Sequence, residues 1–237
     1  MYADHQDRAS SAPEAKLQLA LDLPSLAASL STVCALRPRV GRVEVGTPLM
    51  LHAGVAAIEL VRSVVPSGVK VVADTKICDG GNRIAIDSFK AGADVVTVAG
   101  IAVDGPTWLG VLDAATSSSG PRAVLIDTVG WDADAAGPRL RALIEEAATA
   151  GVPVEICVHR PKDDPPPLPE LFRQFASPTS TGVSRRLIAG KMVSGLVAPA
   201  IEAGFDIVIV GGAVTDSDDP GRAWSALLAE VPTRDSG

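Results

Sequence analysis

The chain has 237 residues, of which 47% are hydrophobic and 21% charged, and this composition is sufficient for one large core in a single domain. Aromatic residues make up only 3% of the chain and the formal net charge is −7, which argues against a nucleic-acid-binding surface. The three cysteines are scattered and form neither a CxxC motif nor a disulfide framework, so we expect a cytoplasmic protein.

The first 15 residues are polar and are predicted to be a disordered leader. They lack the apolar core of a signal peptide, and no later apolar run is long enough to cross a bilayer. We therefore expect no association with a membrane, and we assign residues 16–232 to one domain.

From residue 16 onwards, short apolar runs alternate with amphipathic segments eight times, in units of about 30 residues. The expected strands span residues 16–22, 42–46, 69–74, 93–100, 123–127, 154–160, 186–191 and 205–212. The expected helices span residues 24–36, 53–65, 82–91, 107–115, 138–150, 170–175, 194–203 and 220–228. This order predicts an α/β protein with a (β/α)8 (TIM) barrel. An open nucleotide-binding sheet is disfavoured because its glycine-rich motifs are missing.

The third expected strand has an unusual end. Its apolar run stops at Asp74 and Lys76, and Asp79 follows before the pair Gly80-Gly81. Parallel strands buried on both faces are continuously apolar, so charges at the carboxyl end indicate a ligand-binding or catalytic site. The alternative is an ordinary salt-bridged strand end.

Polar residues recur at the ends of other strands, which a barrel brings together at one rim. These residues are Asp22, Glu44, Asp127 and His159. Carboxylates crowded at one opening raise one another's pKa values unless cations intervene. Lys76 supplies one positive charge, and an Mg²⁺ ion bound by Glu44 and Asp74 would supply more. The alternative for Glu44 and Asp74 is a pair of hydrogen-bonded core acids.

The seventh and eighth strands end in glycine, at the place where barrels often bind phosphate with backbone N–H groups. The residues concerned are Ala189, Gly190, Gly211 and Gly212. Glycine lets the backbone approach an anion closely, although tight turns also use it. Lys191 either adds a positive charge to this site or blocks it.

Six segments together form a distinctive set. They are LQLALD (17–22), VEVGTP (43–48), ADTKICDGG (73–81), GADVVTV (92–98), ICVH (156–159) and VIVGGAVT (208–215). With them the chain, over residues 17–224, resembles the orotidine-phosphate decarboxylase superfamily. The D-x-K-x-x-D pattern is specific to the superfamily. VEVGTP is specific to the branch of 3-hexulose-6-phosphate synthase and 3-keto-L-gulonate-6-phosphate decarboxylase.

The resemblance implies a homodimer that binds Mg²⁺ and a sugar phosphate. The metal ligands would be Glu44 and Asp74. The catalytic residues would be Asp22, Lys76, Asp79, Asp127 and His159. In this family pattern Asp79 reaches into the neighbouring subunit's site, and His159 transfers the proton. The substrate and its phosphate would contact Lys162, Ala189, Gly190, Lys191, Gly211 and Gly212.

The residues that distinguish the two activities of this branch point in both directions. Asp127, Ala189 and Gly212 resemble the synthase. Lys162, which closely follows the histidine, resembles the decarboxylase. Lys191 and the three prolines at 165–167 depart from the family pattern.

We therefore predict a Mg²⁺-dependent aldehyde-lyase that joins ribulose 5-phosphate and formaldehyde through an enediolate. The first alternative is decarboxylation of 3-keto-L-gulonate 6-phosphate, or a related reaction on another sugar phosphate. A second alternative is a barrel that binds a sugar phosphate without catalysis.

Overall fold

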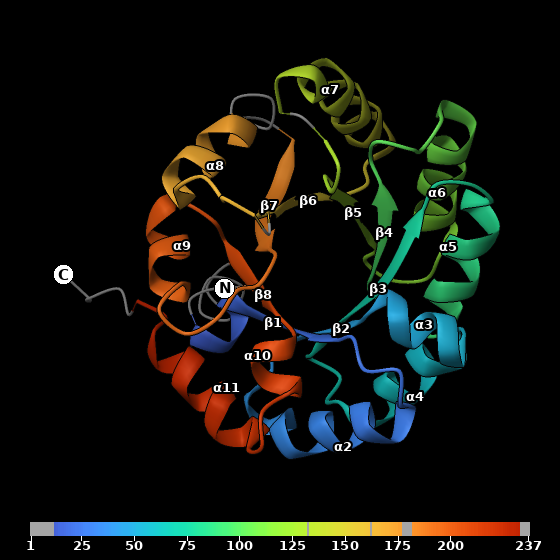
Figure 1. Cartoon of the computed structure of the whole chain (residues 1–237). Coiled ribbons are helices and arrows are strands. Elements are labelled where there is room, and N and C mark those ends of the chain that lie inside the picture. Colours follow the sequence, from blue (N-terminus) through green and yellow to red (C-terminus); the bar gives the residue numbers. More distant parts are fainter. Residues whose placement is uncertain (1–11, 132, 162, 177–181, 233–237) are drawn as a thin grey trace, which may run out of the picture.

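Eight parallel strands close into a barrel in which each strand pairs with the next one along the chain and β8 pairs with β1 (Figure 1). The strands are β1 (Leu17–Leu21), β2 (Arg42–Val45), β3 (Lys70–Ile77), β4 (Val95–Ala99), β5 (Ala123–Asp127), β6 (Val154–His159), β7 (Val183–Ala189) and β8 (Ile207–Val210). This computed structural model describes residues 12–131, 133–161, 163–176 and 182–232. The predicted single-domain (β/α)8 barrel is confirmed.

Helices surround the barrel on its outside (Figure 1). They are α2 (Leu26–Leu36), α3 (Thr47–Ala53), α4 (Ala56–Val64), α5 (Gly81–Lys90), α6 (Gly105–Ser117), α7 (Ala133–Ala150), α8 (Leu168–Ala176), α9 (Val197–Ala203), α10 (Gly212–Thr215) and α11 (Pro220–Ala229). Two short 3-10 helices, η1 (Pro13–Lys16) and η2 (Arg37–Arg39), precede β1 and β2.

Several element boundaries differ from the sequence prediction. The helix expected at 53–65 corresponds to α4, and an additional helix, α3, precedes it where the sequence predicts none. α3 has Pro48 in its first turn and is followed by Gly54, whose φ of +64° separates it from α4. α7 begins at Ala133, before the expected start at Pro138. β7 begins at Val183, three residues before the predicted start, and the short helix α10 begins at Gly212, which the sequence places at the end of the eighth strand.

Part of the predicted leader, residues 1–11, lies outside the described residues. The remaining part includes η1, which leads directly into β1. In the described residues, no helix combines the length and the apolar character needed to cross a membrane.

Apolar side chains form two layers. The outer layer lies between strands and helices and includes the fully buried Trp108 and Trp224. The inner layer fills the barrel itself with Ala20, Val72, Val95, Leu125, Cys157, Leu187, Ala189, Ile207 and Ile209. Inward-facing positions alternate along each strand, so the next inward residues towards the carboxyl ends border the opening of the barrel.

Towards the amino-terminal ends of the strands, the barrel interior contains a buried polar network. The Arg42 guanidinium forms a two-pronged ion pair with Glu155, and the two side chains are only 4% and 2% exposed. Nε of Arg42 also donates to the side-chain amide oxygen Oε1 of Gln18, and the side-chain NH2 group of Gln18 donates to Glu44. Because arginine has only donors, it fixes the orientation of the Gln18 amide. Arg185 donates to Glu155 at 3.2 Å.

We expect Glu155→Ala to lower the free energy of unfolding by about 3–5 kcal/mol, because it leaves a buried guanidinium without its partner. Urea denaturation of both proteins measures this change. The matched control is Asp87→Ala, which removes the exposed Arg83–Asp87 pair and should cost at most about 1 kcal/mol. Equal losses in the two variants would contradict a structural role for the buried pair.

Candidate active site

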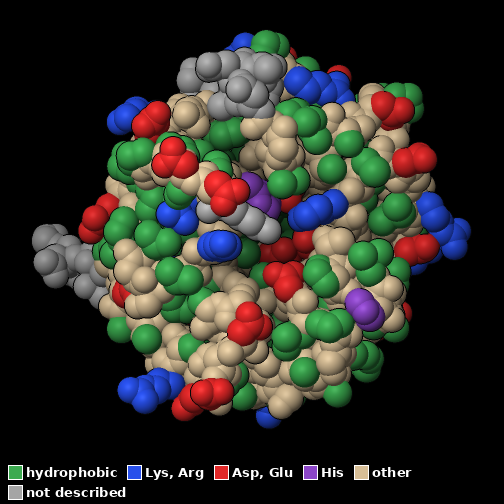
Figure 2. Space-filling view, viewed as in Figure 1, with side chains coloured by type: hydrophobic (Ala, Val, Ile, Leu, Met, Phe, Trp, Pro, Cys, Tyr) green, Lys and Arg blue, Asp and Glu red, His purple; other side chains and the backbone are tan. Residues whose placement is uncertain are grey.

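A cavity of about 690 Å³ lies at the carboxyl-terminal ends of the strands. Figure 2 shows a central hollow on this face, with acidic side chains at its floor and basic and histidine side chains beside it. Predicted catalytic and metal-binding residues line this central cavity: Asp22, Glu44, Asp74, Lys76, Asp127 and His159. The predicted phosphate-binding residues also line it: Ala189, Gly190, Lys191, Gly211 and Gly212.

Two predicted site residues are not placed in this cavity. Asp79 is exposed in the connection between β3 and α5, where its carboxylate accepts a hydrogen bond from the N–H of Gly80 at 2.6 Å. Its role in a neighbouring subunit stays a prediction. Lys162 lies outside the described residues.

Lys76 lies between two carboxylates. Its Nζ is 2.7 Å from Oδ1 of Asp74 and 2.8 Å from Oδ2 of Asp127. Burial by itself would lower the pKa of Lys76, but the charges of Asp74 and Asp127 outweigh burial and raise the pKa above its usual range. Lys76 is therefore a charged hydrogen-bond donor at neutral pH and not a base.

An irregular backbone brings Lys76 to this position. The pairing of β3 with β4 shifts between Ala73 and Ile77, and Lys76 has a left-handed φ of +42°. Such a conformation is strained for a residue with a side chain and persists only where the surroundings hold it. The N–H of Lys76 donates to the hydroxyl of Thr97 at 2.8 Å, which contributes to that restraint. Asp74 and Lys76 thus line the same cavity from within the irregular part of β3.

Two threonines that the sequence analysis did not single out fix the Asp74 carboxylate. Thr97 donates to Oδ1 of Asp74 at 3.0 Å, and Thr47 donates to Oδ2 at 2.8 Å. Both carboxylate oxygens are thus held, and each also contacts Lys76. In the sequence, Thr97 is marked only by being the one hydroxyl residue in the otherwise apolar strand β4.

Asp127 and His159 form a hydrogen-bonded pair. Nε2 of His159 lies 3.0 Å from Oδ1 of Asp127, and the N–H of Val129 donates to the same carboxylate at 2.8 Å. Although burial opposes ionisation, the hydrogen bond and charge of His159, together with Lys76, lower the pKa of Asp127 to about 2. An ionised carboxylate only accepts hydrogen bonds, so Nε2 carries a proton. Nδ1 of His159 is then the atom that can exchange a proton with a substrate.

Asp22 and Glu44 occupy the opposite side of the carboxylate cluster. Burial, reinforced by the charge of Asp74, raises the pKa of Asp22, and the same two causes raise the pKa of Glu44 to about 8. The Asp22 carboxylate fits only because residue 46 is glycine: a Cβ there would lie 2.1 Å from Oδ1. A positive charge beside these acids would stabilise their ionised forms.

The donor set fits a hard divalent cation. Carboxylate oxygens are the ligands that Mg²⁺ prefers, and it is usually bound by one or two of them together with water and substrate oxygens. Glu44 and Asp74 are suited to this role because Gln18, Thr47 and Thr97 orient them. Within the described ranges, no three His, Cys, Asp or Glu side chains form a metal site by themselves. An ion here would therefore need oxygens from other molecules.

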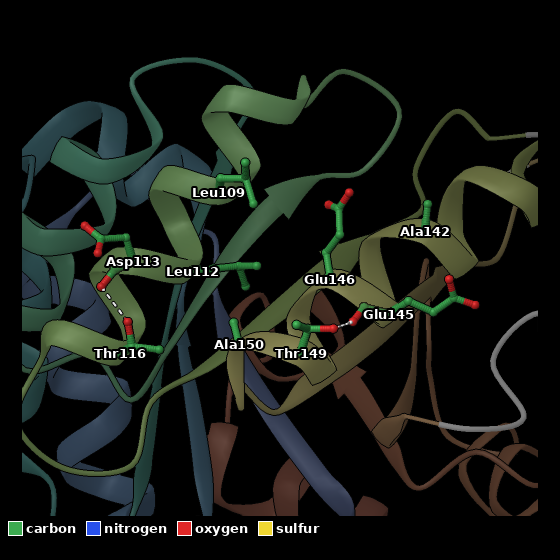
Figure 3. Close-up of a pocket in the computed structure, with 9 residues that line it drawn as sticks. All are labelled: Leu109, Leu112, Asp113, Thr116, Ala142, Glu145, Glu146, Thr149 and Ala150. Carbon is green, nitrogen blue, oxygen red and sulfur yellow. Dashed lines mark hydrogen bonds between the residues drawn. The ribbon is translucent and has the colours of Figure 1, made fainter.

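A second hollow, of about 490 Å³, lies outside the barrel between α6 and α7 (Figure 3). Its lining residues are Leu109, Leu112, Asp113, Thr116, Ala142, Glu145, Glu146, Thr149 and Ala150. This lining contains three acids but no lysine, arginine or histidine side chain. The central cavity, which combines acids, an ammonium group and a histidine, is therefore the candidate active site.

Comparison with known proteins gives one consistent group of matches. Residues 15–148 match the model of the Orotidine 5'-phosphate decarboxylase / HUMPS family. The 3-hexulose-6-phosphate synthase of Methylomonas aminofaciens is 31% identical over 211 residues, covering 89% of this chain and 96% of that protein. The Bacillus subtilis (strain 168) protein of the same name is 29% identical over 213 residues, covering 90% and 96%. A 3-hexulose-6-phosphate synthase crystal structure superposes with a TM-score of 0.77 at 28% identity, covering 92% of this chain and all of the other.

The pKa of Glu44 predicts how stability depends on pH when no metal is present. Between about pH 5 and pH 8 the folded chain retains a proton on Glu44 that the unfolded chain releases, so the free energy of unfolding falls as the pH rises. We expect Glu44→Gln to remove the destabilisation that ionisation of Glu44 causes. In EDTA, which keeps the protein metal-free, Tm of this variant at pH 8 should exceed that of the wild type by at least about 2–4 °C.

Thermal melts of the metal-free protein from pH 5 to pH 8 measure this effect. Glu59→Gln is the matched control, because Glu59 is an exposed acid on α4 and should leave the pH dependence of Tm unchanged. The same pH dependence in wild type and Glu44→Gln would show that Glu44 is not a destabilised acid.

Proposed function

Because the chain belongs to the Orotidine 5'-phosphate decarboxylase / HUMPS family, we propose that it is an aldehyde-lyase that condenses D-ribulose 5-phosphate with formaldehyde. Relatives that align with about nine-tenths of this chain carry the name 3-hexulose-6-phosphate synthase, which supports the proposal. The observation on which it rests is the position of Lys76 between Asp74 and Asp127, in a cavity that His159 also lines.

The first step in this proposal is removal of a proton from C1 of the pentulose phosphate. Nδ1 of His159 is suited to accept this proton, because Asp127 holds the opposite ring nitrogen and stabilises the charged imidazolium. The electrons left at C1 delocalise onto the carbonyl oxygen and give an enediolate. The Lys76 ammonium group is already charged and fixed in place, so it stabilises this oxygen without further reorganisation.

The second step forms the carbon–carbon bond. C1 of the enediolate attacks the carbonyl carbon of formaldehyde, and the electron pair of the C=O bond moves to the formaldehyde oxygen. The proton carried by His159 then converts this oxygen to a hydroxyl group. His159 thus returns to the new hydroxyl group the proton that it took from C1, so the reaction needs no external oxidant, reductant or base. The reverse reaction uses the same residues.

Glu44 and Asp74 would hold the Mg²⁺ ion, and Asp22 would contact the sugar hydroxyl groups. When bound, the ion supplies Lewis-acid stabilisation of the negative charge that develops on the substrate oxygens. The chain's own contribution is orientation: Thr47 and Thr97 hold Asp74, and Gln18 holds Glu44. The metal requirement is tested by thermal melts, in which Mg²⁺ should raise Tm of the wild type but not of Asp74→Asn.

The phosphate would bind at the ends of β7 and β8. Gly190 has a φ of +100°, and a Cβ on it would lie 2.4 Å from the carbonyl oxygen of Arg160, so only glycine fits this turn. Gly212 begins α10, where the first N–H groups have no acceptor within the helix. Asp216 lies close to Gly212 and is unfavourable to an anion, whereas the exposed Lys191 offers a compensating charge.

We expect Lys191→Gly to raise KM for the sugar phosphate about tenfold, with a smaller effect on kcat, because a charged hydrogen bond to phosphate contributes about 1.5–3 kcal/mol. Glycine also suits the left-handed φ of +48° at this position, so the variant should remain folded. Steady-state kinetics measure both constants. An unchanged KM would assign Lys191 no role in phosphate binding.

Arg160 favours a second candidate function, decarboxylation of 3-keto-L-gulonate 6-phosphate. This half-buried residue follows His159 directly and lines a hollow next to it. A guanidinium group there could bind the carboxylate of a keto acid. The enediolate left after loss of CO2 would be stabilised by the same Lys76.

We also propose a cytoplasmic homodimer in which Asp79 completes the neighbouring site. Support comes from the exposure of Asp79 outside its own cavity and from the exposed apolar residues Leu51 and Ile84 on α3 and α5. Cys34 and Cys78 are exposed thiols without a disulfide, as expected in a reducing compartment. Light scattering measures the mass in solution, and a monomer at assay concentration would exclude this role of Asp79.

One assay separates the candidate functions. Purified protein with Mg²⁺ should consume formaldehyde in the presence of ribulose 5-phosphate, and Asp74→Asn should lower kcat/KM at least about 100-fold. Release of CO2 from the keto acid without consumption of formaldehyde would favour the decarboxylase. Binding of ribulose 5-phosphate without either reaction would indicate a non-catalytic sugar-phosphate-binding barrel.

A further inference from the structure

The hollow that Arg160 lines has a volume of about 410 Å³, adjoins the central cavity and is called the side cavity below. It lies between the β5–α7 connection, the β6–α8 connection and α8. His159 and Gly190 line both the side cavity and the central cavity. The proton-transferring histidine therefore stands where the two cavities meet.

Most of the wall of the side cavity is apolar. Val129 and Trp131 contribute from one connection, Pro166 from the other, and Leu171 and Phe175 from α8. Leu171 and Phe175 are only 3% and 6% exposed, so they form a fixed surface within the core. Such a wall is suited to an apolar chain or ring of a ligand.

Trp131 is held firmly in this wall. Its backbone N–H donates to the backbone carbonyl oxygen of Thr128 at 3.0 Å, which fixes the main chain of the turn. Its indole lies against Gly100 so closely that a Cβ on that glycine would be 3.0 Å from the ring. Because glycine has no side chain, the indole of Trp131 can pack against residue 100, at the end of β4.

The side cavity is much larger than the proposed one-carbon substrate requires. Formaldehyde has two heavy atoms, and a single water molecule occupies about 30 Å³ in the liquid. The proposed reaction places the accepting aldehyde beside His159, because that residue returns the proton to the aldehyde oxygen. A substituent on the aldehyde carbon would then have the side cavity available to it.

We propose that the side cavity is an acceptor site that lets this protein condense larger, apolar aldehydes with the pentulose phosphate. This inference rests on the proposed aldolase function and adds to it the class of aldehyde. The bond chemistry is that of formaldehyde: C1 of the enediolate bonds to the carbon of R–CHO, the C=O pair moves to oxygen, and His159 protonates that oxygen. The group R, an alkyl chain or a phenyl ring, lies against Trp131, Leu171 and Phe175.

The test compares formaldehyde, propionaldehyde and benzaldehyde as acceptors for ribulose 5-phosphate, with products identified by mass spectrometry. Gln174→Trp places a large ring at the exposed edge of the side cavity without overfilling the core. We expect this variant to lose at least about tenfold in kcat/KM for the two larger aldehydes and to keep formaldehyde activity within about twofold. Arg173→Trp is the matched control, on the same helix but outside the lining, and should change neither.

A second measurement does not depend on catalysis. Trp131 is half-buried, whereas Trp108 and Trp224 are fully buried, so benzyl alcohol, an unreactive analogue of benzaldehyde, should change mainly the Trp131 fluorescence. The change should saturate and should be absent in Trp131→Phe.

The outcomes separate the two proposals. Formaldehyde condensation without adducts of the larger aldehydes, or an equal loss for all aldehydes in Gln174→Trp, overturns the acceptor site and leaves the proposed function intact. Release of CO2 from the keto acid with no aldehyde condensed overturns both. If no substrate reacts, the proposed function fails, and the absence of saturable Trp131 quenching also excludes the apolar site.

Discussion

The geometry of the opening of the barrel depends on one ammonium group shared by two carboxylates. Lys76 contacts Asp74 and Asp127, which come from β3 and β5. Without its charge, two largely buried carboxylates would lie close together, and one of them would take up a proton. The contact also requires the left-handed backbone at Lys76, so the bulge in β3 and the charge arrangement of the site are parts of the same feature.

The charge and polarity of the side chains inside the barrel change along its axis. At the amino-terminal end, Arg42 and Glu155 neutralise each other in a pair that connects β2 with β6. A layer of apolar side chains follows, and beyond it lie the acids, whose charges Lys76 partly offsets. Gln18 connects the two ends, since Arg42 fixes its amide and its amide group holds Glu44. A structural ion pair thus contributes to the orientation of a proposed metal ligand.

His159 has a comparable position between two hollows. On one side it faces the charged central cavity, and on the other it borders the apolar side cavity. Asp127 fixes which of its nitrogens can exchange a proton. An enediolate stabilised on the polar side and an acceptor held on the apolar side would therefore meet at the residue that carries the proton. Under the proposed mechanism, the choice of acceptor would depend on the side cavity and not on the residues that generate the nucleophile.

The (β/α)8 fold follows from the sequence alone, because eight apolar runs with regular spacing and polar ends leave few other architectures. The family followed from a different signal, the resemblance of six short segments to a known pattern. The sequence also placed Asp22, Glu44, Asp74, Lys76, Asp127 and His159 at strand ends, and the structure brings these residues around one cavity. It did not reveal the supporting residues, since a hydroxyl such as Thr47 or Thr97 is equally consistent with a helix start or a strand. Nor could it pair Arg42 with Glu155, which are 113 residues apart. Such contacts, and the side cavity beside His159, form only when closure of the barrel brings distant strands and loops together, so no local pattern of residues predicts them.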